Sequence, residues 1–137
     1  MIMSIVSLKI HYALLTLVEL SFYLNAEPVQ LRDIADRYSM PSKYLEQILA
    51  TLKQFGFIQS SRGVNGGYSL SKHPDDILIL DVFNSINGTV QVDPKIDNSP
   101  LELFWKNYIL NTQSFLNLSL SEFVVKHYSS NRLTYSI

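Results

Sequence analysis

The residues with the clearest chemistry lie in one short loop, Arg62-Gly63-Val64-Asn65-Gly66-Gly67. Asn-Gly and Gly-Gly tolerate positive φ, so the loop predicts a tight hairpin tip between a strand over 57–61 and a strand over 68–71. The Arg62 guanidinium at the base and the Asn65 carboxamide at the tip can both donate hydrogen bonds to phosphate oxygens. The loop is therefore a candidate phosphate-binding loop.

A glycine-rich loop can also cradle the phosphates of a nucleotide. That chemistry uses a helix N-terminus directly after the loop, or a Gly-Lys-Ser/Thr sequence at its end. Here the loop joins two predicted strands, and neither feature follows it. The sequence therefore disfavours nucleotide binding.

Other residue types that carry chemistry are scattered along the chain. His11, His73 and His127 fall in separate predicted elements, and no Ser/His/Asp or paired-carboxylate arrangement accompanies them. Cysteine is absent, which excludes disulfides, thiolate metal sites and cysteine nucleophiles. A metal site made of histidines with Asp93 and Asp97 stays open, but connectors rich in aspartate are usually solvated turns. We expect no enzyme activity, no metal and no cofactor.

The segment before the loop predicts two consecutive helices. A short amphipathic helix of about two turns ends at Ser39-Met40-Pro41, because a residue before proline avoids the helical region. A second helix follows, with Pro41 in its first turn and Gly56 as its C-terminal stop. The apolar stripe of the first helix is Leu31, Ile34, Ala35 and Tyr38, and that of the second is Tyr44, Leu45, Ile48, Leu49, Leu52 and Phe55.

Helix, tight turn, second helix and hairpin together form a winged helix-turn-helix. The predicted fold class is mainly α with a small β-hairpin wing, extended by a long dimerisation helix. An apolar helix over 7–25, capped by Ser7, serves as a scaffold before this unit. After it, acidic residues and Pro74 predict a helix over 77–87 that ends at Gly88.

The last third of the chain predicts a connector and two further helices. Residues 89–98 show neither helical nor strand periodicity, and Ser99 with Pro100 can start a long helix that ends near Leu116. Ser119 to Glu122 forms a capping box for a short final helix, and a poorly ordered tail is expected from 129 to 137. We therefore divide the chain into a DNA-binding-type domain (1–88), a connector (89–98) and a dimerisation segment (99–137).

The long helix carries more apolar surface than a domain of about 100 residues needs for its own core. An aromatic-rich helix of this kind indicates a subunit interface. The expected interface residues are Leu101, Phe104, Trp105, Tyr108, Ile109 and Phe115.

Composition and charge agree with one folded domain. The 137 residues are 47% hydrophobic and 17% charged. Residues 1–73 hold seven basic and five acidic side chains, whereas residues 74–137 hold four basic and seven acidic ones. The more basic first half could therefore meet phosphate. No apolar run approaches the ~20 residues of a membrane span, and Met1 to Val6 lacks the features of a signal peptide. We expect a cytoplasmic protein without a membrane partner.

With these elements in place, the sequence resembles the Rrf2 family of bacterial winged-helix regulators, which includes an iron–sulfur cluster regulator, a nitric-oxide-sensing repressor and a cysteine-metabolism repressor. The resemblance covers about the whole chain, and the Arg-Gly-x-x-Gly-Gly-Tyr segment is its most specific part. It is carried by Ser7-Leu8-Lys9, Tyr12-Ala13-Leu14, Ile34-Ala35, residues 44–49, Gly56-Phe57-Ile58, residues 61–70 and residues 118–123.

The resemblance implies a homodimer that binds double-stranded DNA at a partly palindromic operator, with repression as the favoured outcome. It implies that the second helix of the motif enters the major groove and presents Ser42, Lys43, Glu46 and Gln47. Lysine can then donate to phosphate or guanine, glutamate can accept from the cytosine amino group, and glutamine can pair with adenine. Further contacts are expected, mainly to phosphate, from Lys9, Arg32, Arg62, Asn65 and the backbone amide of Gly66.

Three departures from the family pattern matter. Pro41 stands where members usually have a capping serine. The three cysteines that hold an iron–sulfur cluster in many members are absent from the connector, which excludes a cluster of that kind. His11 occupies a position where some members have a non-cysteine ligand, but here it has no partners. The effector is expected to be a small molecule or a partner protein, and the alternative function is a protein-interaction module that has lost operator binding.

Overall fold

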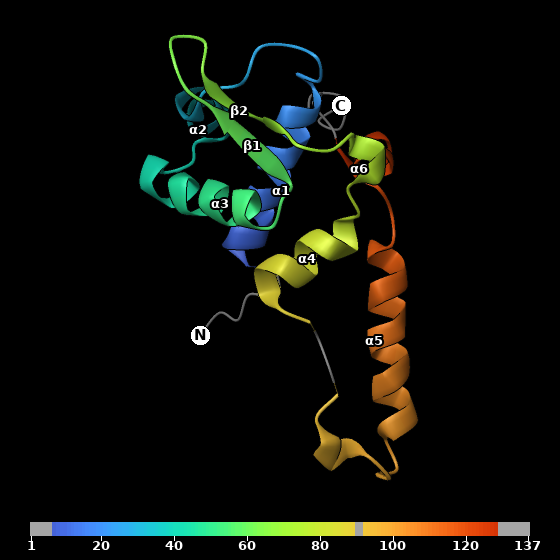
Figure 1. Cartoon of the computed structure of the whole chain (residues 1–137). Helices are drawn as coiled ribbons and strands as arrows, with labels where there is room; N and C mark the ends of the chain where they lie inside the picture. Colours follow the sequence, from blue (N-terminus) through green and yellow to red (C-terminus); the bar gives the residue numbers. More distant parts are fainter. Residues whose placement is uncertain (1–6, 90–91, 129–137) are drawn as a thin grey trace, which may run out of the picture.

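The computed structural model describes residues 7–89 and 92–128 (Figure 1). The expectations about the start of the chain and about the tail from residue 129 concern residues outside this range. The elements are α1 (Leu8–Ser21), α2 (Leu31–Tyr38), α3 (Ser42–Gln54), β1 (Ile58–Ser61), β2 (Gly67–Leu70), η1 (Pro74–Asp76), α4 (Ile79–Asn87), η2 (Pro94–Ile96), α5 (Glu102–Leu116) and α6 (Leu120–His127).

The predicted helix-turn-helix is present as α2 and α3. Ser39 ends α2 in the left-handed region at φ 54°, and the N–H of Met40 donates to the carbonyl of Ala35 at 2.9 Å. The Met40 side chain is buried, which fixes the turn from inside. Pro41 was expected in the first turn of the second helix, but it is the N-cap residue and makes no side-chain cap bond. Its extended backbone, with ψ near 127°, places it just before that turn.

The predicted hairpin is confirmed, and it gains a third segment that sequence reasoning missed. β1 and β2 pair antiparallel, with Ser61 opposite Gly67. Val29, in the loop between α1 and α2, forms a further antiparallel bridge with Tyr68 through two hydrogen bonds of 2.8 Å. This bridge ties the base of the wing to the segment that leads into α2.

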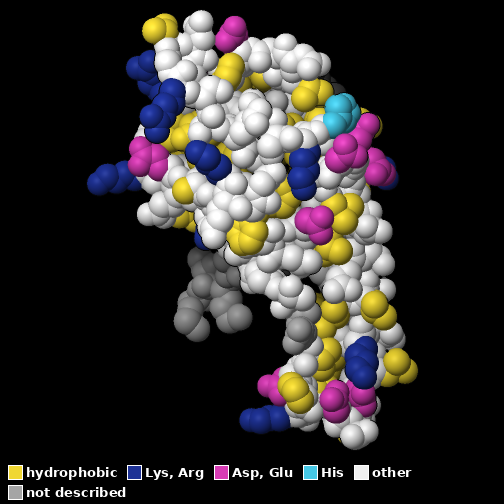
Figure 2. Space-filling model, viewed as in Figure 1, with side chains coloured by type: hydrophobic (Ala, Val, Ile, Leu, Met, Phe, Trp, Pro, Cys, Tyr) yellow, Lys and Arg dark blue, Asp and Glu magenta, His cyan; other side chains and the backbone are white. Residues whose placement is uncertain are grey.

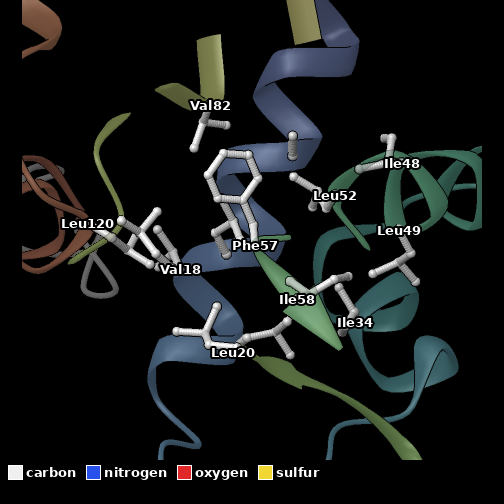
Figure 3. Close-up of a cluster of buried hydrophobic side chains, with 14 of the residues drawn as sticks. Val18, Leu20, Ile34, Ile48, Leu49, Leu52, Phe57, Ile58, Val82 and Leu120 are labelled. Carbon is white, nitrogen blue, oxygen red and sulfur yellow. The ribbon is translucent and has the colours of Figure 1, made fainter. Parts of the chain in front are cut away.

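α1 forms the centre of the core. It contacts α2, α3, α4, α6 and β2, so apolar side chains reach it from nearly every direction. Figure 3 shows labelled side chains of α2, α3, β1, α4 and α6 gathered around α1. The most deeply buried large side chains are Ile10, Leu17, Val18, Leu20, Ile34, Leu45, Ile48, Leu49, Leu52, Ile77, Ile79 and Leu120.

The end of the described chain returns to this core. Leu78 forms an antiparallel bridge with Ser119, and the N–H of Leu120 donates to the carbonyl of Ile77 at 2.7 Å. Because 77–78 stay extended to make this bridge, α4 begins at Ile79 and not at 77 as expected. The predicted capping box of Ser119 and Glu122 is confirmed at the start of α6. Of the segment assigned to dimerisation, α6 is thus part of the core cluster, near Val18 (Figure 3).

α5 is different, because none of its residues is buried and it extends away from the core (Figure 1). It begins at Glu102, not at the expected Ser99 cap. The Ser99 hydroxyl instead accepts from the N–H of Leu101, and the Glu102 carboxylate accepts from the N–H of Asn98 and pairs with Lys106. These bonds lower the pKa of Glu102 and raise that of Lys106. The connector, expected to be irregular, contains the short turn η2.

α1 is also shorter than its apolar pattern suggested. It ends at Ser21, and 22–25 form turns in which Asn25 takes a positive φ of 65°. No helix within 7–89 and 92–128 combines the length and apolar character needed to cross a membrane.

The wing base generates a first prediction. A Cβ at Gly67 would lie 2.5 Å from the carbonyl oxygen of Val29, whereas a Cβ at Gly63 (φ +104°) would meet nothing within 4 Å. Gly67→Ala should therefore break the Val29 bridge and destabilise the protein by roughly 3 kcal/mol. Gly63→Ala should cost only the backbone strain, about 1 kcal/mol. Urea unfolding of both variants measures the difference, and equal losses would contradict the proposed contact.

Candidate nucleic-acid interface

α3 has two faces with different chemistry. Leu45, Ile48, Leu49 and Leu52 are buried against the core, and Tyr44 packs edge-on against Tyr12 of α1 at 5.6 Å between ring centroids. The opposite face is exposed and carries the predicted readers Ser42, Lys43, Glu46 and Gln47. Their spacing of one and four residues places them on one side of the first two turns, where a helix can present them together.

The wing lies next to this helix. Lys53, in the last turn of α3, donates to the hydroxyl of Ser60 in β1 at 2.7 Å, a link that sequence reasoning missed. Arg62 and Asn65 are exposed, as a phosphate-binding role requires. Gly66 is buried, and its N–H donates to the carbonyl of Gly63 at 3.0 Å. In the free protein Gly66 thus shapes the wing tip, and its contact with DNA stays a prediction.

Two further predicted contacts are positioned by α1 and α2. Lys9 is half-buried in the first turn of α1, one turn before Tyr12, which contacts Tyr44 of α3. Arg32 lies in the first turn of α2, just after the Val29 bridge to the wing, and is exposed. Figure 2 shows Lys and Arg side chains gathered at the upper left, over the wing and the adjoining helices, with most acidic groups elsewhere. On the face shown, several basic side chains therefore lie over the wing and the helices beside it.

A buried polar cluster lies behind this surface. The Glu19 carboxylate of α1 is 3% exposed, accepts from the Tyr38 hydroxyl at 2.9 Å and lies 3.3 Å from Nε of Arg37. Burial, together with hydrogen bonds to Tyr128 and Glu19, raises the pKa of Tyr38. The nearby Glu19 charge raises the pKa of Arg37. Sequence reasoning treated Tyr38 only as core and overlooked Glu19, although a glutamate inside the apolar run Leu-Val-Glu-Leu was the available signal.

The residues predicted for dimerisation lie along α5 and its first turn. Trp105 makes edge-on contacts with Phe104 and Tyr108, at 4.9 and 6.0 Å between centroids. Ile109 is half-buried, because it lines a groove of about 240 Å³ between α4 and α5. The others are exposed, by 39% to 71%: Leu101, Phe104, Trp105, Tyr108 and Phe115.

The described residues do not fit an iron–sulfur cluster. The chain has no thiolate, which is the ordinary ligand of such clusters. In the connector, Asp93 accepts the N–H of Lys95 at 2.9 Å and so acts as the cap of η2. No group of three or more His, Cys, Asp or Glu residues comes together within the described ranges. His11 is exposed and tilted against Tyr12.

Comparisons with known proteins agree with the winged helix-turn-helix fold class. The structure superposes on CymR, the global cysteine regulator of B. subtilis, with a TM-score of 0.80 and 27% identity, over 92% of this chain and all of that one. It superposes on T. potens IscR with a TM-score of 0.77 and 27% identity, over 95% and 96% of the two chains. These likenesses confirm the predicted fold class.

The sequence comparisons point the same way. A helix-turn-helix transcriptional regulator of Synechocystis is 32% identical over 98 residues, which are 71% of this chain and 67% of that protein. Curated IscR relatives are matched over about half of their length. The family described as Rrf2, iron-dependent transcriptional regulator, matches residues 6–103. With this match over most of its length, the chain belongs to the Rrf2 family of DNA-binding transcriptional regulators.

Proposed function

We propose that this protein is a sequence-specific DNA-binding repressor that acts as a homodimer, without an iron–sulfur cluster, on a partly palindromic operator. The observation that carries the proposal is the exposed polar face at the start of α3, flanked by the wing and backed by a rigid core. An α-helix fits the major groove, and a hairpin beside it can reach the minor groove or the backbone.

Base recognition falls to the exposed side chains of α3. Glu46 can accept from a cytosine amino group, and Gln47 can form two hydrogen bonds with adenine. Lys43 can donate to guanine or phosphate. The buried residues on the other side of α3 hold its backbone in place on the core. These side chains would therefore enter a groove from a fixed backbone position.

Phosphate contacts supply most of the affinity. Lys9, Arg32 and Arg62 lie on α1, on α2 and directly after the wing strand β1, three elements that contact α3. Each of these side chains can neutralise a phosphate. The start of α3 adds a second source, because Pro41 provides no side-chain cap and leaves the first N–H groups of the helix available. The positive end of the α3 dipole therefore favours a phosphate at this position.

The homodimer is supported by α5. In the single chain its aromatic side chains are exposed to water, which is unfavourable for so large an apolar surface. A second copy that packs along α5 would cover them and place two recognition helices at a pair of half-sites. As a DNA-binding regulator, the protein would work in the cytoplasm, where the bacterial chromosome lies.

Selection from random-sequence DNA tests the proposal. The wild-type protein is expected to enrich an inverted repeat, and Gln47→Ala should relax the choice of base at one position in each half-site, by ~1–3 kcal/mol. The control is Lys126→Ala, an exposed position on α6, which should leave the motif unchanged. Enrichment of no motif by the wild type would instead favour the protein-interaction module. The same result is expected if operator binding requires an effector, a small molecule or a partner protein, that is absent from the reaction.

The phosphate contacts generate a separate prediction. Arg62→Ala should weaken binding to every DNA sequence. It should also lower the slope of log binding constant against log salt concentration by about one, because one phosphate contact is lost. Lys126→Ala removes a surface charge from α6 and serves as the control. Fluorescence anisotropy at several salt concentrations gives both slopes, and identical slopes for the two variants would rule out a wing contact.

The dimer is tested with Phe104→Asp, which puts a charge into the exposed aromatic side of α5. The variant should become monomeric and lose roughly 100-fold in operator affinity, since two half-sites are no longer bound by linked domains. Val125→Asp, at an 85% exposed position on α6, is the control. Sedimentation of both variants and the wild type provides the measurement, and a monomeric wild type would contradict the proposal.

A further inference from the structure

Glu19 is the only charged side chain that is buried within residues 7–89 and 92–128. A buried carboxylate is costly unless hydrogen bonds and opposite charge compensate for the lost water. Two groups do so here: the Tyr38 hydroxyl donates at 2.9 Å, and Arg37 Nε lies at 3.3 Å. The carboxylate of α1 therefore holds two consecutive residues of another helix.

Those two residues occupy a particular place in the fold. Arg37 and Tyr38 are the last residues of α2, and only Ser39, Met40 and Pro41 separate them from α3. The turn is the covalent link between the end of α2 and the start of α3, whose buried stripe packs on the core. A restraint at the end of α2 is thus passed on within three residues to the start of the recognition helix.

The turn itself has two weak points. Pro41 makes no side-chain cap bond to α3, and Ser39 is in the left-handed region, which costs energy for a residue other than glycine. Apolar packing holds both sides of the turn, through buried Met40 and the buried stripe of α3. The hydrogen bond from Tyr38 to Glu19 adds a directional, polar link between α1 and the end of α2.

The Tyr38 hydroxyl has a second neighbour besides Glu19. Its oxygen lies 3.5 Å from the hydroxyl oxygen of Tyr128, the residue that follows α6. Since burial and these hydrogen bonds raise the pKa of Tyr38, its hydroxyl keeps its proton at neutral pH and remains a donor to Glu19. The Tyr38 hydroxyl thus links α1, α2 and the residue that follows α6.

We propose that Glu19 is a positioning residue for DNA recognition: by holding Tyr38 and Arg37 it sets the angle at which α3 meets the major groove. The inference rests on the proposed function, because it concerns how the reading helix is aimed. It assigns a role to a residue that touches no DNA. A misaimed helix loses base contacts first, while phosphate contacts made by long, flexible side chains persist.

The test compares Tyr38→Phe and Glu19→Met with Ile77→Val, a conservative change at a fully buried site between η1 and α4. Tyr38→Phe is preferred to an Arg37 variant, because the Arg37 side chain is 54% exposed and its loss would also remove a surface cation. All three variants should remain folded, with a similar loss of Tm. Affinity is measured for the selected operator and for scrambled DNA of equal length.

Tyr38→Phe and Glu19→Met should each weaken operator binding about tenfold, the equivalent of ~1.4 kcal/mol, and change binding to scrambled DNA less than about twofold. Ile77→Val should change neither. The double variant should lose no more than Glu19→Met alone, because the carboxylate acts through the phenol. Equal losses on both DNAs, an equal loss in Ile77→Val, or multiplied losses in the double variant would overturn the proposal.

A second measurement does not need an operator. Amide hydrogen exchange at residues 39–45 of the free protein should become faster in Tyr38→Phe and in Glu19→Met, and stay unchanged in Ile77→Val. If the wild type selects no DNA motif, the proposed function fails, yet this exchange still decides whether Glu19 orders the start of α3. Unchanged exchange at 39–45 in Tyr38→Phe would overturn the positioning role by itself.

Discussion

The burial of α1 is the constraint on which the other elements depend. α1 is an apolar helix that contacts α2, α3, α4, α6 and β2. Each of these elements packs against α1 with one of its sides. Each surrounding element is therefore amphipathic, and its other side stays free for polar residues. The exposed face of α3 exists because the buried face is needed by α1. The residues proposed to read DNA therefore lie on the side of α3 that the core does not use.

The same core explains why the wing and the helix pair act as one body. The Val29–Tyr68 bridge joins the wing to the loop before α2, and the Lys53–Ser60 bond joins α3 to β1. Together with the Glu19 cluster, these links connect all parts of the basic surface to α1. A surface restrained in this way loses little conformational entropy when it meets a rigid duplex.

Local patterns predicted most of this architecture, because helix periodicity, turn residues and capping boxes are encoded within a few neighbouring positions. α2, the turn at 39–41, α3, the hairpin and the cap of α6 followed from such patterns. The late start of α4 did not, because it depends on a bridge between Leu78 and Ser119, some forty positions apart. The roles of Val29 and Glu19 were missed for the same reason, because their partners Tyr68 and Tyr38 are distant in sequence. For Glu19 the apolar run around it marked an unusual position, but the sequence alone did not identify its partner.

The bridge between 77–79 and 118–120 has a consequence for how this protein can change over time. The bridge turns the intervening segment into a long closed loop, because it fixes the two ends of that segment side by side on the core. The free energy of closing such a loop grows only slowly with its length. The number of residues between Asn87 and Leu118 is therefore only weakly constrained by the free energy of folding. α4 itself is constrained, because Ile79 and Val82 are buried in the core.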